Sequence, residues 1–386
     1  MLTVTTKSGA IGCEFVALVL LGCWGRHTAH TYADFSLAFL FVSIICAVTV
    51  GEIGPETFKT PNFSTQLRQE NGPMVGFALL AGTCVQFGNF LVQYGCALVG
   101  VTITMPINAS LIVIIGTTLN YFLDRKLNNA KILFPGVACF CLAVMAGIIT
   151  HITFEKYKVK VRTSRSGQGA VTAAGGPRLR LHKTANGETL SESLDAKQVW
   201  KTETRSTTIT TKNSTRLGIL VCVVAGCCSG LFGPAFNVCT NDQFKLLKPG
   251  VPPLTVYTGY FYFCLAYIFW AFIETVLAMR FPPLGQPRTT WSEYIFDASP
   301  YRLVAFVGGL MVSAANVLQF LGGQAAGYAA SDMVQANPLV STLWGILFFR
   351  EYHGANRRVI CLLLTMYAFY IAATGLLVGS SSKRES

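Results

Sequence analysis

Amide side chains recur at helical spacing inside long apolar stretches of this sequence. Three stripes have spacings of three or four residues, which place their members on one helix face at about 3.6 residues per turn. The stripes are Gln86, Asn89 and Gln93; Ser313, Asn316 and Gln319; and Gln324, Tyr328, Asp332 and Gln335. Asn108 is a further amide residue that stands alone. Amides donate and accept hydrogen bonds, so these residues predict a binding site for a neutral polar solute. In the alternative, they only join neighbouring helices, at about 0.6 kcal/mol per contact.

Carboxyl groups inside such stretches predict proton coupling. Asp332 lies well inside its stretch, where an ionisable side chain is costly, usually functional and often part of a proton relay. We expect Asp332 to carry a coupling proton, with help from Glu14. In the alternatives, Asp332 only hydrogen-bonds Tyr328 or a neighbouring helix, and Glu14 lies at the membrane surface. Glu274 is a weaker candidate, because it is close enough to Arg280 for its side chain to reach the membrane surface.

The elements that must position these side chains are membrane-spanning helices. Hydrophobic residues make up 52% of the chain and charged residues 12%, with a mean hydropathy of +0.48, whereas soluble proteins carry about 25% charged residues. A helix needs about 20 apolar residues to cross the hydrocarbon core. Ten apolar stretches predict an all-α membrane protein: Gly9–Gly25, Ala33–Val50, Pro73–Ala97, Val101–Leu123, Ile132–Ile152, Leu217–Thr240, Leu254–Met279, Leu303–Gly322, Gln324–Phe349 and Val359–Val378. Asp124, Arg125 and Lys126 mark the exit of the fourth stretch into the lipid headgroups.

The chain divides into two membrane halves joined by a polar segment. Residues 1–152 hold five predicted spans, residues 153–216 form a linker, and residues 217–386 hold the other five. The linker is rich in Thr, Ser, Gly, Lys and Arg and nearly free of aromatic residues, a composition that predicts disorder. We expect it to act as a tether, or as a regulatory segment open to phosphorylation.

The distribution of positive charge predicts how the chain is inserted. Thirteen of the thirty Lys and Arg residues lie in Lys156–Arg216, and cytoplasmic loops carry the excess of positive charge. The linker is therefore expected in the cytoplasm and both termini outside. The glycosylation sequon at Asn62 would then face outside and the one at Asn213 inside.

A weak internal repeat relates the two halves. At an offset of 227 residues, Asn and Gly residues of the third and fourth spans recur in the eighth and ninth, namely Asn89 with Asn316, Gly95 with Gly322 and Gly100 with Gly327. Because each half holds an odd number of spans, the second half must be inserted upside down relative to the first. Two inverted five-helix repeats around a site at the membrane midplane are a transporter architecture.

Other kinds of site have little support in the sequence. All thirteen cysteines lie inside or at the edges of the predicted spans, which argues against a disulfide framework. His27 and His30 have metal-like spacing but no acidic cluster beside them, so we expect them at the membrane surface. No phosphate-binding loop motif occurs. We therefore expect no enzyme activity, no metal and no cofactor other than protons as the coupling ion. No nucleic-acid partner is expected, since the positive charge lies in the linker and at span ends.

Four longer segments resemble the ureide permeases of plants. They are GTTLNYFLDRKLNNAKILFPGVACF from Gly116, GLFGPAFNVCTNDQFKLLKPGVPPLTVYTGYFYF from Gly230, GGQAAGYAASDMVQANPLVSTLWGILFFREY from Gly322, and HTYADFSLAFL from His30 with the following GEIGP. The resemblance spans nearly the whole chain apart from the linker. It implies ten spans arranged as in the drug/metabolite transporters. It also implies proton-coupled import of allantoin, uracil and related oxo-heterocycles, usually across the plasma membrane. Cyclic ureas present alternating N–H and C=O groups, which suit the amide stripes.

Two features depart from that family. Its members have a Trp-Pro and further residues between the first span and the His-Thr-Tyr motif, whereas Trp24 here is followed almost directly by His30. The 17 residues of Gly9–Gly25 reach about 26 Å, against about 30 Å of hydrocarbon. The family also has an acidic residue where this chain has Met105, which leaves the acidic role to Asp332. The nearest alternative function is a sugar or nucleotide-sugar carrier of the same architecture.

Overall fold

The computed structural model describes residues 27–53, 56–57, 60–99, 101–125, 128–173, 212–282, 287–331, 346 and 355–380. Within them the chain is helical, and the only β pairing is an isolated bridge between Thr57 and Thr60. The helices of this described part are α2 (Thr28–Val48), α3 (Phe63–Gln66), α4 (Gly72–Val99), α5 (Val101–Leu123), α6 (Ala130–Ala173), α8 (Lys212–Gly230), α9 (Phe232–Asn241), α10 (Val256–Arg280), α11 (Trp291–Phe296), α12 (Tyr301–Ala326), α13 (Tyr328–Ser331) and α15 (Arg357–Gly379).

Eight segments of the described chain are long and apolar enough to cross a membrane. They confirm the predicted second to eighth and tenth spans, with ends that differ by a few residues. These spans are Ala29–Val48, Gly72–Cys96, Thr104–Leu123, Ala130–Phe154, Arg216–Asn241, Val256–Arg280, Tyr301–Ala326 and Arg357–Gly379. The predicted first span lies outside the described residues, as does most of the ninth. The total of ten therefore stays a prediction.

The span Arg216–Asn241 consists of two helices, α8 and α9, separated at Leu231. Pro234 lies in the first turn of α9, where the missing N–H leaves no hydrogen bond unmade. At its other end, Asp242 adopts the left-handed region at φ +44° and donates its N–H to the carbonyl of Val238. Helix α9 is therefore held as a short, separately capped segment inside the bundle.

Gly327 separates α12 from α13. Its φ of +89° favours glycine, and a Cβ atom there would lie 2.7 Å from Oδ1 of Asn128. The prediction that Gln324 and Tyr328 share one helix is therefore wrong: Gln324 lies in the last turn of α12, and Tyr328 begins α13. The rest of that predicted stripe, Asp332 and Gln335, lies outside the described residues, as does Glu14.

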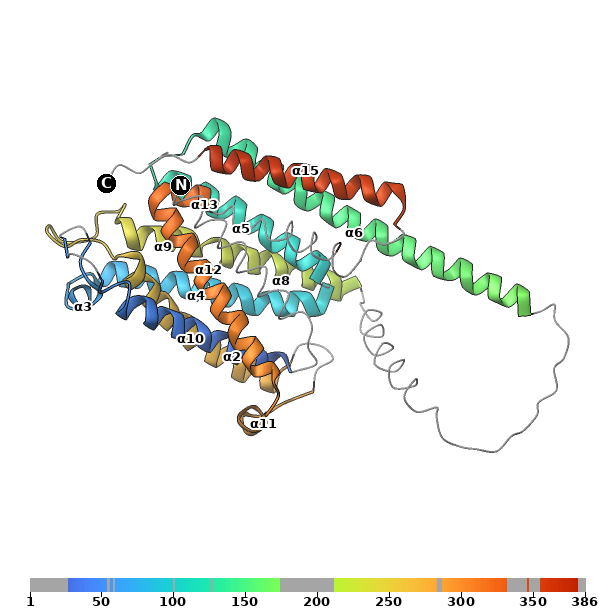
Figure 1. Ribbon diagram of the computed structural model, residues 1–386, viewed down its shortest axis with the longest axis horizontal. Coiled ribbons are helices and arrows are strands. Elements are labelled where there is room, and N and C mark those ends of the chain that lie inside the picture. Colours follow the sequence, from blue (N-terminus) through green and yellow to red (C-terminus); the bar gives the residue numbers. More distant parts are fainter. Residues whose placement is uncertain are drawn as a thin grey trace.

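The packing of the helices joins α10 to both halves of the described bundle. Helix α10 packs against both α2 and α4, α2 also packs against α12, and α4 also packs against α8. Helices α6 and α15 lie side by side along one edge, and α6 continues past the end of the bundle to Ala173 (Figure 1). We call that end the linker end, because α6 continues there into residues 153–173, the first part of the predicted linker, which are helical.

Two glycines allow very close helix crossings. A Cβ atom at Gly82 of α4 would lie 2.1 Å from the carbonyl oxygen of Phe263 in α10, and one at Gly309 of α12 would lie 2.3 Å from that of Phe35 in α2. Small residues let helix backbones approach closely in membranes. These crossings bring the polar side chains of α2, α4 and α10 together.

Candidate functional site

A buried amide–carboxyl pair joins α4 to α10. Nε2 of Gln86 donates a hydrogen bond of 2.6 Å to Oε2 of Glu274, and Gln86 and Glu274 are 0% and 2% exposed. The second oxygen of each side chain, Oε1, is also buried and accepts no hydrogen bond from any described residue. A buried polar atom without a partner costs about 1–3 kcal/mol. The two Oε1 atoms therefore favour the binding of a further group that donates hydrogen bonds.

The structure differs from the expectation that Glu274 reaches the membrane surface beside Arg280. The two residues are six apart on α10 and so point about 120° away from each other around the helix. Arg280 is exposed, whereas Glu274 faces inward toward Gln86. The sequence does hold a sign of this, since Glu274 has no basic residue three or four positions away along α10.

Three further side chains extend the pair toward α2. Asn89 lies one turn beyond Gln86, and its Nδ2 donates to the hydroxyl of fully buried Tyr267 across 3.5 Å, the weak limit of a hydrogen bond. The hydroxyl of Tyr32 is buried beside Tyr267 and Gln86 and forms no hydrogen bond with a described residue. The site therefore offers amide, carboxyl and hydroxyl groups from α2, α4 and α10, several with unused capacity.

The other predicted residues of the described chain lie on separate helices. Gln93 is half-buried on α4, and Asn316 and Gln319 are buried on α12, with 9% and 1% exposed. The amide oxygens of Gln319 and of Asn108 on α5 are buried and without a donor among the described residues. No hydrogen bond within the described chain joins these residues to Gln86 or Asn89. The structure thus brings Gln86 and Asn89 together with Glu274, which the sequence ranks lower.

A second polar network is centred on Asp124. The expectation that Asp124 extends into the headgroups is wrong, because its side chain is buried and accepts 2.9 Å hydrogen bonds from Nδ2 of Asn237 and from the backbone N–H of Tyr328. Nδ2 of Asn237 also donates to Oδ1 of Asn120 at 3.1 Å, and the hydroxyls of Tyr328 and Thr240 are 3.0 Å apart. The network docks α13 against α5 and α9, and Tyr328 takes part in this docking.

The local sequence conceals that role for Asp124. Asp124, Arg125 and Lys126 form a charged triplet of the kind that marks a span end, and Arg125 is indeed exposed. Asn120 precedes Asp124 by four residues and so lies on the same helix face. That pairing of polar residues is the feature that indicates an inward-facing carboxylate.

At the linker end, α11 is tied to the start of α2. Nε2 of His30 and the hydroxyl of Thr289 are 2.8 Å apart, and the Tyr294 hydroxyl donates to Asp34 at 2.6 Å. Arg302 approaches the Asp34 carboxylate at 3.7 Å. His30 is thus buried among protein side chains, 6% exposed, at the start of a span. His30 and Asp34 belong to the HTYADF segment, which serves here to hold a short helix across the end of the bundle.

Apolar helices that enclose unsatisfied amides and a carboxyl group define a class of protein. In a bilayer, polar groups are placed inside a bundle where they serve a pathway for a solute or an ion. The described fold and site are therefore those of a polytopic membrane transporter.

Comparison with known proteins gives the family. The sequence model described as ureide permease matches residues 31–380. Ureide permease 2 and ureide permease 1 of Arabidopsis thaliana are each 41% identical to this chain, with all of both chains covered. Probable ureide permease A3 of Vigna unguiculata is 38% identical, over 92% of this chain and 98% of its own length. The chain belongs to the ureide permease family and is a transporter, not an enzyme.

Proposed function

We propose that this transporter imports allantoin, uracil and related oxo-heterocycles together with protons. The observation that carries the proposal is the Gln86–Glu274 pair, because two of its oxygens are buried between α4 and α10 and accept no hydrogen bond from a described residue. A ureide ring supplies N–H donors for these oxygens and C=O acceptors for hydroxyl and amide donors such as Tyr32 and Asn89. A hexose offers hydroxyl groups and a ring oxygen in place of the N–H and C=O groups that alternate around a ureide ring.

Glu274 is the described carboxyl group best placed for proton coupling. It lies inside a span and is hydrogen-bonded to Gln86 of the candidate solute site. Protonation of Glu274 would therefore change the contacts that the solute makes there. Asp332 and Glu14 remain proposed proton carriers alongside it. The remaining candidate solute contacts are Gln93, Asn108, Asn316, Gln319, Gln324, Tyr328 and Gln335.

We also propose that the two halves are inverted repeats that alternate access to this site. Several observations support it. Helices at equivalent positions run in opposite directions: Ala29 at the start of α2 packs near Met279 at the end of α10, and Asn129 just before α6 bonds Ser380 just after α15. The two close crossings also correspond, since Gly309 follows Gly82 by the same 227 residues that relate Asn89 to Asn316.

The proposed orientation has the linker in the cytoplasm and the protein in the plasma membrane. Asn62 caps α3 at the end of the bundle opposite the linker end (Figure 1), so its sequon would face outside. A glycan at Asn62 supports this orientation, and a glycan at Asn213 reverses it.

Uptake by cells that express the protein tests the function. We expect labelled allantoin and uracil to accumulate faster at acid than at neutral pH, and a protonophore to remove that difference. Labelled hexose and nucleotide-sugar should not accumulate above the level of cells without the protein. Saturable hexose or nucleotide-sugar uptake with no ureide uptake would refute the proposal, and pH-independent ureide uptake would refute its proton-coupled part.

A further inference from the structure

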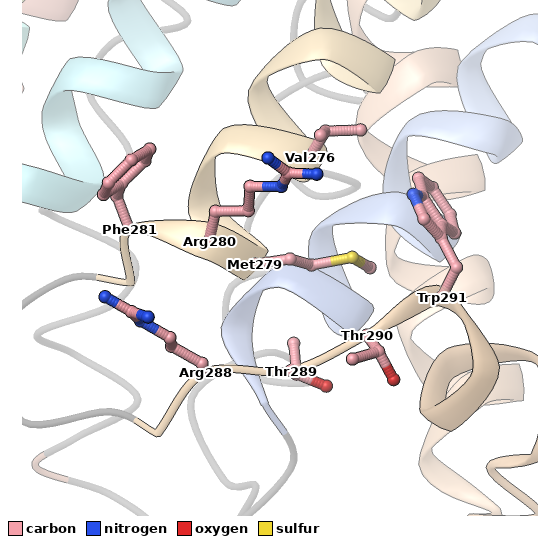
Figure 2. A pocket seen from close by; sticks show the side chains of 8 residues that line it. All are labelled: Val276, Met279, Arg280, Phe281, Arg288, Thr289, Thr290 and Trp291. Carbon is pink, nitrogen blue, oxygen red and sulfur yellow. The ribbon is translucent and has the colours of Figure 1, made fainter.

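A cavity of about 700 Å³ lies where α10 ends and the chain leads into α11 (Figure 2). Its walls come from the end of α10 with Phe281 and from residues 288–291. They include Met279, Arg280, Phe281, Arg288 and Trp291. None of the Gln86–Glu274 site residues lines it, so it is a separate feature of the linker end.

The described walls of this cavity carry positive charge. Arg280 and Arg288 both line it, and neither forms an ion pair with any described residue. The nearby acids of the α11 segment are engaged elsewhere: Glu293 accepts a 2.5 Å hydrogen bond from the Thr289 hydroxyl, and Asp297 lies 3.8 Å from His30. Two guanidinium groups without carboxylate partners favour an anionic ligand.

The cavity lies at the depth of the lipid headgroups. It begins where α10 ends, and the ring of Trp291 stacks on Phe272 with centroids 5.4 Å apart. Phe272 is 58% exposed on the outer face of α10, and Ile295 and Phe296 of α11 are 62% and 81% exposed. Tryptophan gathers at membrane–water boundaries, and exposed apolar residues on a short helix at a span end are typical of contact with that boundary. The cavity is therefore within reach of lipid as well as of water.

We propose that this cavity binds the phosphate headgroup of an anionic phospholipid. Arg280 and Arg288 donate charge-assisted hydrogen bonds to the phosphate oxygens, since guanidinium groups match phosphate in both charge and geometry. Trp291 and Phe281 flank the glycerol and upper acyl chains. Basic pockets at the ends of spans bind lipid headgroups in this way. The site does not depend on which solute the transporter carries.

The test measures lipid retention by the full-length protein. Purified protein in nanodiscs of phosphatidylcholine with a minor fraction of phosphatidic acid is transferred to detergent, and bound lipid is counted by native mass spectrometry. We expect one phosphatidic acid to be retained in preference to phosphatidylcholine. The Arg280→Gln/Arg288→Gln variant should bind it about 25-fold more weakly, since each basic residue near an anionic headgroup contributes about a fivefold factor.

A matched control keeps the result specific. Arg357 and Arg358 are exposed at the start of α15, at the same end of the bundle, and Arg357→Gln/Arg358→Gln should retain the lipid as the wild type does. Equal retention by both double variants would overturn the proposal. So would displacement of phosphatidic acid by millimolar inorganic phosphate, which would make the cavity a site for free phosphate. Circular dichroism of each variant separates lost binding from lost folding.

Discussion

The rings of Phe39 on α2 and Tyr267 on α10 stack in parallel, with centroids 4.3 Å apart and planes 2° apart. Tyr267 follows Phe39 by 228 residues, close to the offset of 227 between equivalent residues of α4 and α12. Under the proposed inverted repeat, the stack therefore joins nearly equivalent positions of the two halves. Where a twofold relation exists, residues on its axis meet their own counterparts, so this stack marks where the proposed axis crosses the bundle.

The chemistry around that point differs between the halves. Tyr267 has a hydroxyl group that reaches Asn89, and its counterpart Phe39 has none. Glu274 corresponds to Cys46 at the offset of 228, and Gln86 corresponds to Ser313 at the offset of 227. The amide–carboxyl pair is therefore formed once, on the α4–α10 side of the stack. The proposed repeat, with one polar side, is suited to holding one solute at a time.

The two close glycine crossings give the first prediction. Alanine at Gly82 or Gly309 places Cβ 2.1 or 2.3 Å from a backbone carbonyl oxygen, and the helices must separate to relieve the overlap. We expect each variant to lose about 1–3 kcal/mol of stability, measured as a lower midpoint of thermal unfolding in detergent. Gly76→Ala on α4 is the control, because nothing lies within 4 Å of a Cβ atom there. If both crossing variants unfold at the wild-type temperature, the close approach is absent.

The Gln86–Glu274 pair gives the second prediction. We expect Glu274→Gln to lower ureide uptake at acid pH by at least about tenfold and to flatten its dependence on pH. That change replaces a hydrogen bond to a carboxylate, worth about 1.5–3 kcal/mol, by a neutral amide–amide hydrogen bond of about 0.5–1.5 kcal/mol, and it leaves no titratable oxygen. Gln86→Ala should raise KM for ureide more than it lowers the maximal rate. Glu52→Gln, which changes a loop carboxylate bonded to Ser64, should leave uptake unchanged. A wild-type pH profile in Glu274→Gln would exclude this residue from coupling.

The eight described spans could be predicted from sequence because apolar length alone sets them. The site could be predicted only in part, because periodicity gives the face of a helix but not its neighbour. Gln86 on the predicted polar face of α4 is buried, whereas its partner Glu274 lies 188 residues later and is identified only by packing. A local sequence pattern also misleads where it is compatible with two structures. The Asp124 triplet resembles a span exit, and Gly327 lies within an apolar run that reads as one helix.

The Asp124 network gives the third prediction. In Asp124→Ala, the backbone N–H of Tyr328 and one N–H of Asn237 lose their acceptor, at a cost of about 1–3 kcal/mol for each buried group left unpaired. We expect a lower unfolding midpoint and slower transport, because α13 is no longer fixed against α5 and α9. Arg125→Ala alters the exposed neighbour and should have little effect on either measurement.

A double-mutant cycle separates this network from general damage near the α5 end. If Asp124 and Asn237 act through their hydrogen bond, Asp124→Ala/Asn237→Ala should cost less than the sum of the two single changes. Additive losses would contradict a direct interaction between the two side chains.

The cap of α11 gives a prediction about pH. The Thr289 hydroxyl and then the Thr290 backbone N–H donate to the Glu293 carboxylate, and both lower its pKa below the ordinary value. A carboxyl group with a lowered pKa stabilises the fold above its unfolded pKa, and this contribution is lost as the pH falls through the folded pKa. We expect the environment of Trp291, the first residue of α11, to stay constant above about pH 4.5 and to change at lower pH. Fluorescence of a variant that keeps Trp291 as its only tryptophan measures this, and Thr289→Val should move the midpoint to higher pH. A midpoint that does not move in Thr289→Val would show that the cap does not depend on that hydroxyl.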